Sequence, residues 1–194
     1  MIPLRFLSKM GNYNIRIGGV VIHVRVVDNA NLVDQSLSEI RHQIGTNTAV
    51  GLIFKSSKML QICVGSRCLM VLLSHMDISN IPQSLKNFLA EQGICFVGVA
   101  TSMDRMNMGF YGIECKNIVD VSELAARVLK KPHLYGYGRE LKKLAAEVGL
   151  QLVEIPSLAQ FNWSAKFFSH EEIEYAVHDV CASSLIGTKL LGML

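Results

Sequence analysis

The sequence predicts a mixed α/β domain whose first strands pair antiparallel and whose sheet is flanked by helices. Three observations lead to this prediction. Alternating apolar residues on either side of Gly18-Gly19 have the pattern of a β-hairpin. Short apolar runs such as 49–54 follow, and these are typical of buried strands. From Pro82 onward, apolar residues recur roughly every three to four positions in several segments, which indicates helices.

The spacing of the apolar residues gives the bounds of the individual strands and helices. The predicted strands are 13–17, 20–27, 49–54, 59–64, 67–72, 94–99 and 116–120. Gly65-Ser66 is a favoured two-residue turn between the fourth and fifth of these strands. The predicted helices are 32–44, 82–92, 102–110, 121–129, 139–148 and 170–191. Gly45 is expected to end the first helix, and Ser169 is expected to cap the last.

The composition is that of one globular domain, 1–194, with a core from about 13 to 191. Half of the 194 residues are apolar and 18% are charged, and no apolar run reaches the roughly 18–20 residues of a membrane span. No membrane association is therefore expected. The net charge of +3 permits nucleic-acid binding without requiring it.

Cysteine usage and the N-terminus bear on location. The five cysteines are odd in number and form no CxxC, so we expect reduced, buried thiols and no sulfur-bound metal. The cytoplasm or nucleus is the predicted location. Arg5, Lys9 and the absence of acids before Asp28 are features of a mitochondrial presequence, but this segment becomes strand-like by Tyr13, so that reading is not favoured.

Several short motifs together resemble a known family. They are Leu60–Gly65, Ile81–Leu85, Val97–Asp104, Asn117–Asp120, Glu140–Val148, Asn162–Ser164 and Tyr175–Asp179. In order and spacing the chain resembles the Werner-like 3′–5′ exonucleases of the DEDDy, DnaQ-like class, in the ribonuclease H-like superfamily. It is most similar to small plant enzymes, including those that clear Argonaute cleavage products. The resemblance implies a ribonuclease H-like fold with an antiparallel start to its sheet.

The resemblance also implies a two-ion hydrolysis site. Two Mg²⁺ or Mn²⁺ ions, roughly 3.5–4 Å apart, stabilise the attacking and leaving oxygens and are held by carboxylates. By resemblance, Asp104 and Asp179 are two of these metal-binding carboxylates. Tyr175, one helical turn before Asp179, corresponds to the tyrosine that positions the attacking water.

The first acidic motif of the family is missing. Its Asp-x-Glu pair on the first core strand corresponds here to Ile53 and Lys55, and no acid occurs from Ile40 through Met76. A lysine beside a cation site opposes cation binding. We therefore expect a remnant half-site of Asp104, Tyr175 and Asp179 that binds Mg²⁺ or Mn²⁺ weakly or not at all.

Other residues near this region allow two interpretations. Lys55, Lys58 and Arg67 form a basic stretch, which is either a solvated strand edge or a nucleic-acid site in which Lys55 replaces the missing metal charge. His178 is expected to face away from Asp179 and to be a surface histidine rather than a general base.

The predicted function is that of a degenerate 3′–5′ exonuclease-fold protein, catalytically inactive, that acts by binding. Its partner is a protein, an active paralogue or nucleic acid, and a homo- or hetero-oligomer is expected from the ring-forming relatives it resembles. The alternative is an active Mg²⁺-dependent 3′–5′ exonuclease (exoribonuclease) releasing nucleoside monophosphates, with a carboxylate supplied across a subunit interface. A third reading, engineered loss of the acids, is disfavoured because the loop after Phe54 is also shortened.

Overall fold

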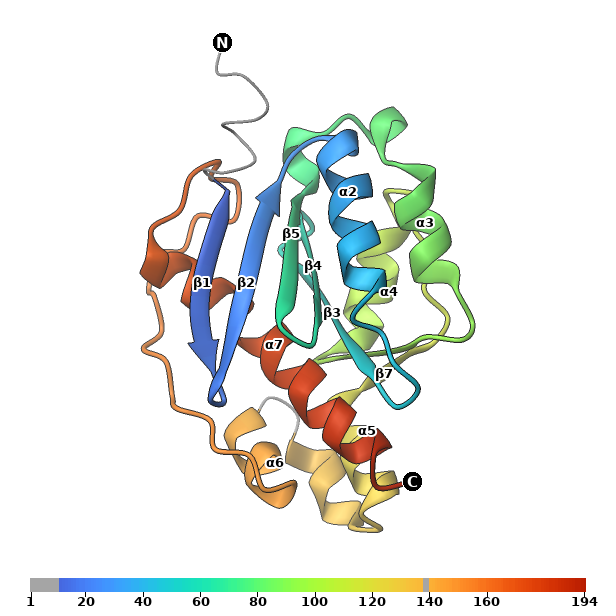
Figure 1. Cartoon of the computed structure of the whole chain (residues 1–194), viewed down its shortest axis with the longest axis vertical. Helices are drawn as coiled ribbons and strands as arrows, with labels where there is room; N and C mark the ends of the chain where they lie inside the picture. The colour runs from blue at the N-terminus through green and yellow to red at the C-terminus, as the bar shows by residue number, and fades with distance from the viewer. Residues whose placement is uncertain (1–10, 138–139) are drawn as a thin grey trace.

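A mixed β-sheet runs through the centre of the protein (Figure 1). The computed structural model describes residues 11–137 and 140–194, and in these residues seven strands form one sheet of order β1-β2-β5-β4-β3-β6-β7. The strands are β1 (Asn12–Ile17), β2 (Val20–Val27), β3 (Ala49–Lys55), β4 (Met59–Val64), β5 (Arg67–Leu72), β6 (Cys95–Gly98) and β7 (Ile118–Asp120). The predicted mixed α/β class, with an antiparallel β1–β2 hairpin at its start, is confirmed.

The sheet combines antiparallel and parallel pairings. The β3–β4 and β4–β5 pairs are antiparallel, whereas β2–β5, β3–β6 and β6–β7 are parallel. In the first hairpin, Gly18 and Gly19 both have positive φ, at 56° and 80°. This is the conformation that a tight two-residue turn requires and that glycine adopts without steric cost.

Helices cover both faces of the sheet (Figure 1). The α-helices are α2 (Ala30–Arg41), α3 (Gln83–Ala90), α4 (Thr101–Gly109), α5 (Val121–Val128), α6 (Leu141–Glu147) and α7 (His170–Leu191). Short 3₁₀ turns occupy Leu73–His75, Ile78–Asn80 and Pro132–Tyr137. One apolar core joins the sheet to α2 and α3, and a second joins its other face to α5, α6 and α7. No described helix has the length and hydropathy needed to cross a membrane.

The first helix ends earlier than predicted. The sequence placed its end at Gly45, but α2 stops at Arg41. The chain then continues as a 3₁₀-type turn. The Gln43 N–H donates to the Ile40 carbonyl, and the Ile44 N–H donates to the Arg41 carbonyl. Ile44 still packs against the α2–α3 core, so its apolar character does not mark a helical position.

α7 crosses β3 at very close range. A Cβ built at Gly51 would overlap the Val180 carbonyl oxygen, and one at Gly187 would lie 2.7 Å from the Ala49 Cβ. Hydrogen bonds fix the same crossing, since the Ser184 hydroxyl donates to the Ala49 carbonyl at 2.9 Å. This contact holds the residues of α7 at a set distance above the end of β3.

Candidate functional site

The end of β3 carries the two positions at which the expected acids are missing. Successive side chains on a strand point to opposite faces, so Ile53 and Lys55 face α7 while Phe54 faces the α2–α3 core. Ile53 is buried, at 3% exposure, in the core beneath α7. An apolar side chain therefore fills the position where the resemblance implies a metal-bridging carboxylate.

Asp104 lies on the first turn of α4, next to the same strand end. The residue is 6% exposed, and its carboxylate accepts a hydrogen bond from the Phe54 N–H at 3.1 Å. A strained turn directs α4 toward β3, because Ala100, at the helix N-cap, has φ of 54°. The Asp120 carboxylate holds this turn by accepting from the Ala100 N–H at 3.1 Å.

Asp179 on α7 is paired with a lysine. Lys55 Nζ lies 3.2 Å from Asp179 Oδ2, and both side chains are partly exposed. On the other side, His178 Nδ1 lies 3.4 Å from Asp179 Oδ1. Burial alone would raise the pKa of Asp179, but hydrogen bonding from His178 and the charge of Lys55 together lower it below its ordinary value. The carboxylate is therefore ionised and already has a positive partner.

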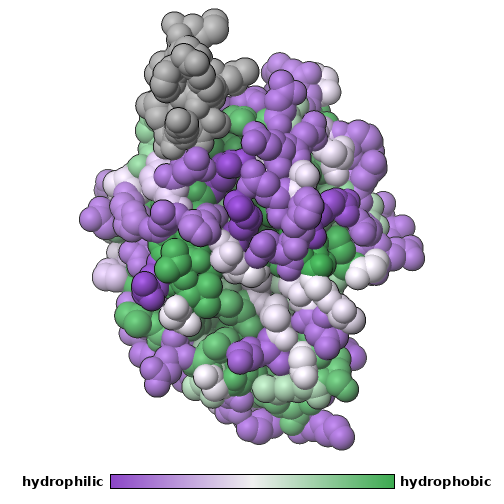
Figure 2. All heavy atoms as spheres, viewed as in Figure 1, coloured by the Kyte–Doolittle hydropathy of each residue, from purple (hydrophilic) through white to green (hydrophobic). Residues whose placement is uncertain are grey.

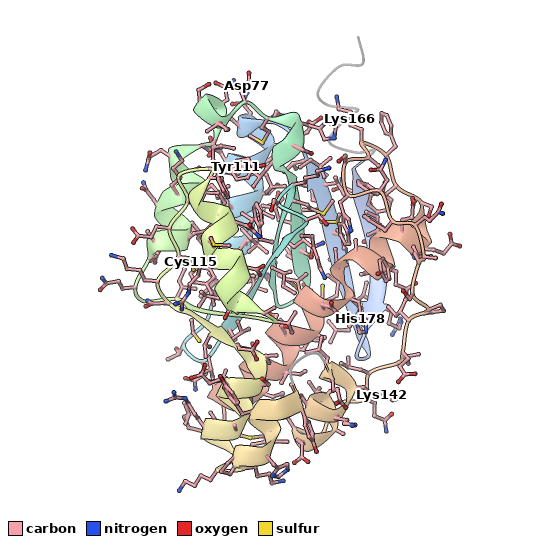
Figure 3. All side chains as sticks on the ribbon, turned by 180° about the vertical axis from the view of Figure 1, so that it is seen from behind. Asp77, Tyr111, Cys115, Lys142, Lys166 and His178 are labelled. Atoms are coloured by element: carbon pink, nitrogen blue, oxygen red, sulfur yellow. The ribbon has the colours of Figure 1, made fainter. Side chains whose placement is uncertain are left out.

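His178 lies closer to this carboxylate than the sequence suggested. We expected it to face away from Asp179, yet its ring contacts that side chain and is 19% exposed. In the view from behind, α7 crosses in front of the sheet and carries His178 on its course (Figure 3). Helical spacing predicts only where the Cα–Cβ bond points, whereas the side-chain rotamer decides which neighbour the ring reaches, and sequence spacing does not give the rotamer.

Aromatic rings form one wall of the site. Tyr175 on α7 lies 5.7 Å from the ring of Phe161 and 6.5 Å from that of Trp163, and Lys55 Nζ lies 5.6 Å from the Trp163 ring. A pocket of about 190 Å³ opens between these groups and is lined by Lys55, Glu154, Ile155, Trp163, Tyr175, His178 and Asp179. Phe161 and Glu154 were not singled out in the sequence, since their segment has no regular secondary structure.

The predicted basic stretch does not form one surface. Lys55 and Lys58 flank the β3–β4 turn, and Lys58 Nζ donates to the Ser164 hydroxyl at 2.7 Å. Arg67 begins β5 at the opposite end of the sheet, where it pairs with Glu39 at 2.7 Å. The stretch lacks nearby acids in the sequence, but the fold supplies acidic partners to both Lys55 and Arg67.

Comparison with known proteins decides the family. A family model described as 3′–5′ exonuclease matches residues 50–194, which is most of the chain. The chain belongs to the 3′–5′ exonuclease domain family. It is 27% identical over 125 residues to a 3′–5′ exonuclease of Arabidopsis thaliana and 30% identical over 124 residues to exonuclease 3′–5′ domain-containing protein 2 of Drosophila melanogaster. These matches cover 64% and 63% of this chain but only 42% and 20% of the two relatives.

A solved structure agrees with this assignment. The exonuclease domain of EXD2, in crystals soaked in Mn and Mg, superposes with a TM-score of 0.51 at 26% identity, covering 87% of this chain and 89% of that one. The fold is therefore a ribonuclease H-like α/β fold, and the DnaQ-like exonuclease resemblance is confirmed.

The residues of this exonuclease domain do not fit a two-ion site. Hard divalent cations need several oxygen ligands. At the end of β3 the chain offers the alkyl group of Ile53 and the ammonium of Lys55, and the Asp104 carboxylate is hydrogen-bonded to the backbone. The divalent-ion chemistry of the family therefore has no matching ligand set at this position.

Removing the Lys55 charge is expected to raise the pKa of Asp179. The Lys55→Met variant keeps an alkyl chain at this position but loses the ammonium. Burial, which disfavours the ionised carboxylate, is then offset by His178 without the help of Lys55. NMR titration of the Asp179 side-chain carboxyl carbon measures this change. Lys58→Met, which removes a lysine bonded to Ser164, is the control and should leave this pKa unchanged. An Asp179 pKa that is identical in wild type and Lys55→Met would contradict the assigned pairing.

Proposed function

We propose that this member of the exonuclease family does not hydrolyse phosphodiester bonds and acts by binding. The observation that carries the proposal is the ion pair between Lys55 Nζ and Asp179 Oδ2 at 3.2 Å. By the motif correspondence, Lys55 replaces a carboxylate that would bind a divalent cation, and its ammonium pairs with Asp179, which would be another ligand of that cation. The burial of Ile53 supports the same proposal, because the resemblance assigns a bridging carboxylate to this position and the chain has a side chain there that packs in the core.

The partner that we infer is a protein rather than nucleic acid. Two of the three cations expected to bind phosphate are paired with acids, Lys55 with Asp179 and Arg67 with Glu39. The third, Lys58, donates to the Ser164 hydroxyl. Glu154 adds a further carboxylate to the pocket wall, where it pairs with Lys142 at 3.4 Å. The affinity of a protein for nucleic acid comes mostly from Lys and Arg side chains that are available to phosphate groups. These ion pairs therefore argue against nucleic acid as the partner.

A larger pocket beside the site supports a protein contact. It measures about 360 Å³, shares Glu154, Ile155 and His178 with the first pocket, and extends to the β1–β2 turn. Val153 in its wall is 80% exposed. Figure 2 shows apolar residues gathered over the lower part of the molecule, between the β1–β2 hairpin and α6. Exposed apolar surface next to a pocket is typical of protein interaction sites, and an active paralogue in a mixed oligomer is one such partner.

A nuclease assay tests the loss of hydrolysis. The purified chain is incubated with 5′-labelled single-stranded RNA and DNA in Mg²⁺ and, separately, in Mn²⁺. We expect the full-length substrate to persist. The Asp104→Asn variant is assayed in parallel, because cleavage that survives this change comes from a contaminant. Stepwise shortening from the 3′ end that Asp104→Asn abolishes would establish the active exonuclease instead.

A salt titration tests the choice of partner. If phosphate contacts mattered, the affinity for single-stranded RNA or DNA would be measurable at low salt and would fall steeply with salt concentration. We expect no measurable binding by fluorescence anisotropy at low salt. Affinity that falls with salt and is weakened by Lys55→Met would reverse the choice in favour of nucleic acid.

A further inference from the structure

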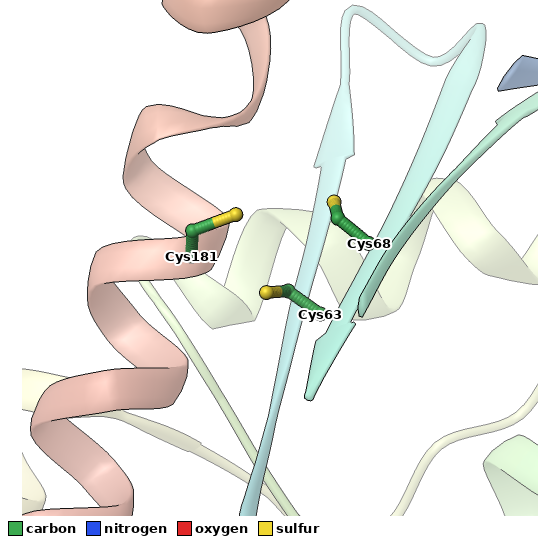
Figure 4. A group of neighbouring side chains, drawn as sticks. All are labelled: Cys63, Cys68 and Cys181. Atoms are coloured by element: carbon green, nitrogen blue, oxygen red, sulfur yellow. The ribbon is translucent and has the colours of Figure 1, made fainter. Parts of the chain in front are cut away.

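Three cysteines from distant parts of the chain meet in the core beneath α7. Cys63 lies on β4, Cys68 on β5 and Cys181 on α7, and their Sγ atoms all lie within 4.8 Å of one another. Figure 4 shows the three side chains pointing into the same space. The sequence suggested separate core thiols and no sulfur-bound metal. That expectation overlooked the cluster because one member is more than a hundred residues from the other two.

The fold brings the three sulfurs together by strand register and helix crossing. Cys63 and Cys68 are direct partners in the β4–β5 hairpin, one pair in from its two-residue turn. Directly opposite side chains on neighbouring antiparallel strands lie on the same face of the sheet. α7 packs on that face and contributes Cys181, two residues after Asp179.

The surroundings of these sulfurs are dry and apolar. Cys63 and Cys181 have no exposed area and Cys68 is 2% exposed. Their core cluster includes Met59, Met70 and other apolar side chains. Among the described residues, no His, Asp or Glu side chain joins the three thiols as a further ligand. An occupant therefore has three sulfur ligands and no charged group to balance an excess of charge.

The three thiols lie next to one another in the core. Burial raises the pKa of both Cys68 and Cys181 well above the ordinary value. The three Sγ atoms lie within 4.8 Å of one another and point into the same space, so one centre can replace the thiol protons and bind all three sulfurs.

The charge of the complex selects among thiophilic ions. Three thiolates contribute three negative charges, so Cu⁺ would leave a net charge of minus two and Zn²⁺ a net charge of minus one. A net charge buried in apolar surroundings is strongly unfavourable. Zinc also takes a fourth ligand, and no His, Asp or Glu in the described part of the chain supplies one to this cluster. A trivalent centre with three sulfur ligands is neutral.

We propose that Cys63, Cys68 and Cys181 form a buried three-sulfur site for trivalent arsenic or antimony. The ligand enters as the neutral trihydroxide. Each of three thiols gives its proton to one hydroxide, three water molecules leave, and three arsenic–sulfur bonds replace three arsenic–oxygen bonds. No electrons are transferred, so the step needs no oxidant or reductant.

The required movement is small. A metal–sulfur bond is about 2.3 Å long, so two sulfurs on one centre lie roughly 3.5–4 Å apart. The three Sγ atoms now lie within 4.8 Å of one another, so the most distant pair has to move closer by roughly 1 Å. Once bound, the centre cross-links α7 to the β4–β5 hairpin, next to the Asp179 site.

Arsenite binding to the full chain tests this site. We expect one arsenic per chain, three arsenic–sulfur bonds by X-ray absorption spectroscopy, and a rise in Tm of about 5 °C at saturation. Cys63→Ser, Cys68→Ser and Cys181→Ser should each lose the three-sulfur signal. Cys95→Ser and Cys115→Ser are matched controls outside the cluster and should keep it.

The coordination number in the unmodified chain decides the proposal even if a cluster variant fails to fold. Three sulfurs around one arsenic support it. Oxygen ligands, two sulfurs only, or no arsenic bound to the folded chain would overturn it. Displacement of arsenic by equimolar Zn²⁺ or Cu⁺ would overturn the assignment to a trivalent centre, because the charge argument predicts the opposite preference.

Discussion

Replacing Ile53 with Asp and Lys55 with Glu together will strengthen Mn²⁺ binding by at least about 100-fold, a change worth roughly 2.7 kcal/mol. The double variant removes one positive charge and adds two carboxylates beside Asp179 and the end of β3. One pair of opposite charges about 4 Å apart is worth roughly 4 kcal/mol at an effective dielectric constant of 20. The expected gain is therefore well within what restored ligands supply. Titration followed by Mn²⁺ electron paramagnetic resonance measures it.

Two further variants show whether this gain is specific to the site. Lys58→Glu makes the same change of charge as Lys55→Glu, but at a lysine bonded to Ser164 instead of Asp179. It should change Mn²⁺ affinity little. Lys55→Glu alone leaves the buried Ile53 in place, so it separates the charge effect from any disturbance of the core. Equal gains from Lys58→Glu and the double variant would show that overall charge, and not the site, controls the affinity.

The Gly51→Ala variant will lose about 3 kcal/mol of unfolding free energy or more. The added methyl group would overlap the Val180 carbonyl oxygen, and neither β3 nor α7 can retreat without breaking the core between them. Forced overpacking of this kind typically costs about 1–3 kcal/mol, and backbone atoms yield less readily than side chains. Urea unfolding followed by circular dichroism measures the loss.

Gly93→Ala is the matched control for this prediction. Gly93 is exposed, and a Cβ built there has no heavy atom within 4 Å. Its unfolding midpoint should stay close to that of the wild type. If both variants lost the same stability, the cause would be a general effect of replacing glycine, and the close crossing of α7 over β3 would not be the anchor that we describe.

The sheet was readable from the sequence because its signals are local. Alternation over 20–27, the apolar run at 49–54 and the Gly65-Ser66 turn each report the conformation of neighbouring residues. The end of α2 was misplaced because Ile44 continues the apolar spacing while packing as a loop residue. Hydrophobic spacing reports burial, and it distinguishes a helix from a following turn poorly.

The site was only partly readable because its partners lie far apart in the chain. The order of motifs identified Asp104, Tyr175 and Asp179 as a group, and the acid-free strand identified Ile53 and Lys55. The Lys55–Asp179 pair joins residues 124 positions apart, and the three-cysteine cluster joins β4 and β5 to α7. No local pattern encodes such contacts, since they depend on where α7 crosses the sheet.

We propose that Lys55, paired with Asp179, takes the place of the catalytic cations. A titration of the unmodified chain with Mn²⁺, read by electron paramagnetic resonance, tests it most directly. We predict no site with a Kd tighter than about 1 mM, which corresponds to roughly 4 kcal/mol of binding free energy. Two Mn²⁺ ions bound per chain with micromolar Kd, and displaced by Mg²⁺, would contradict the claim.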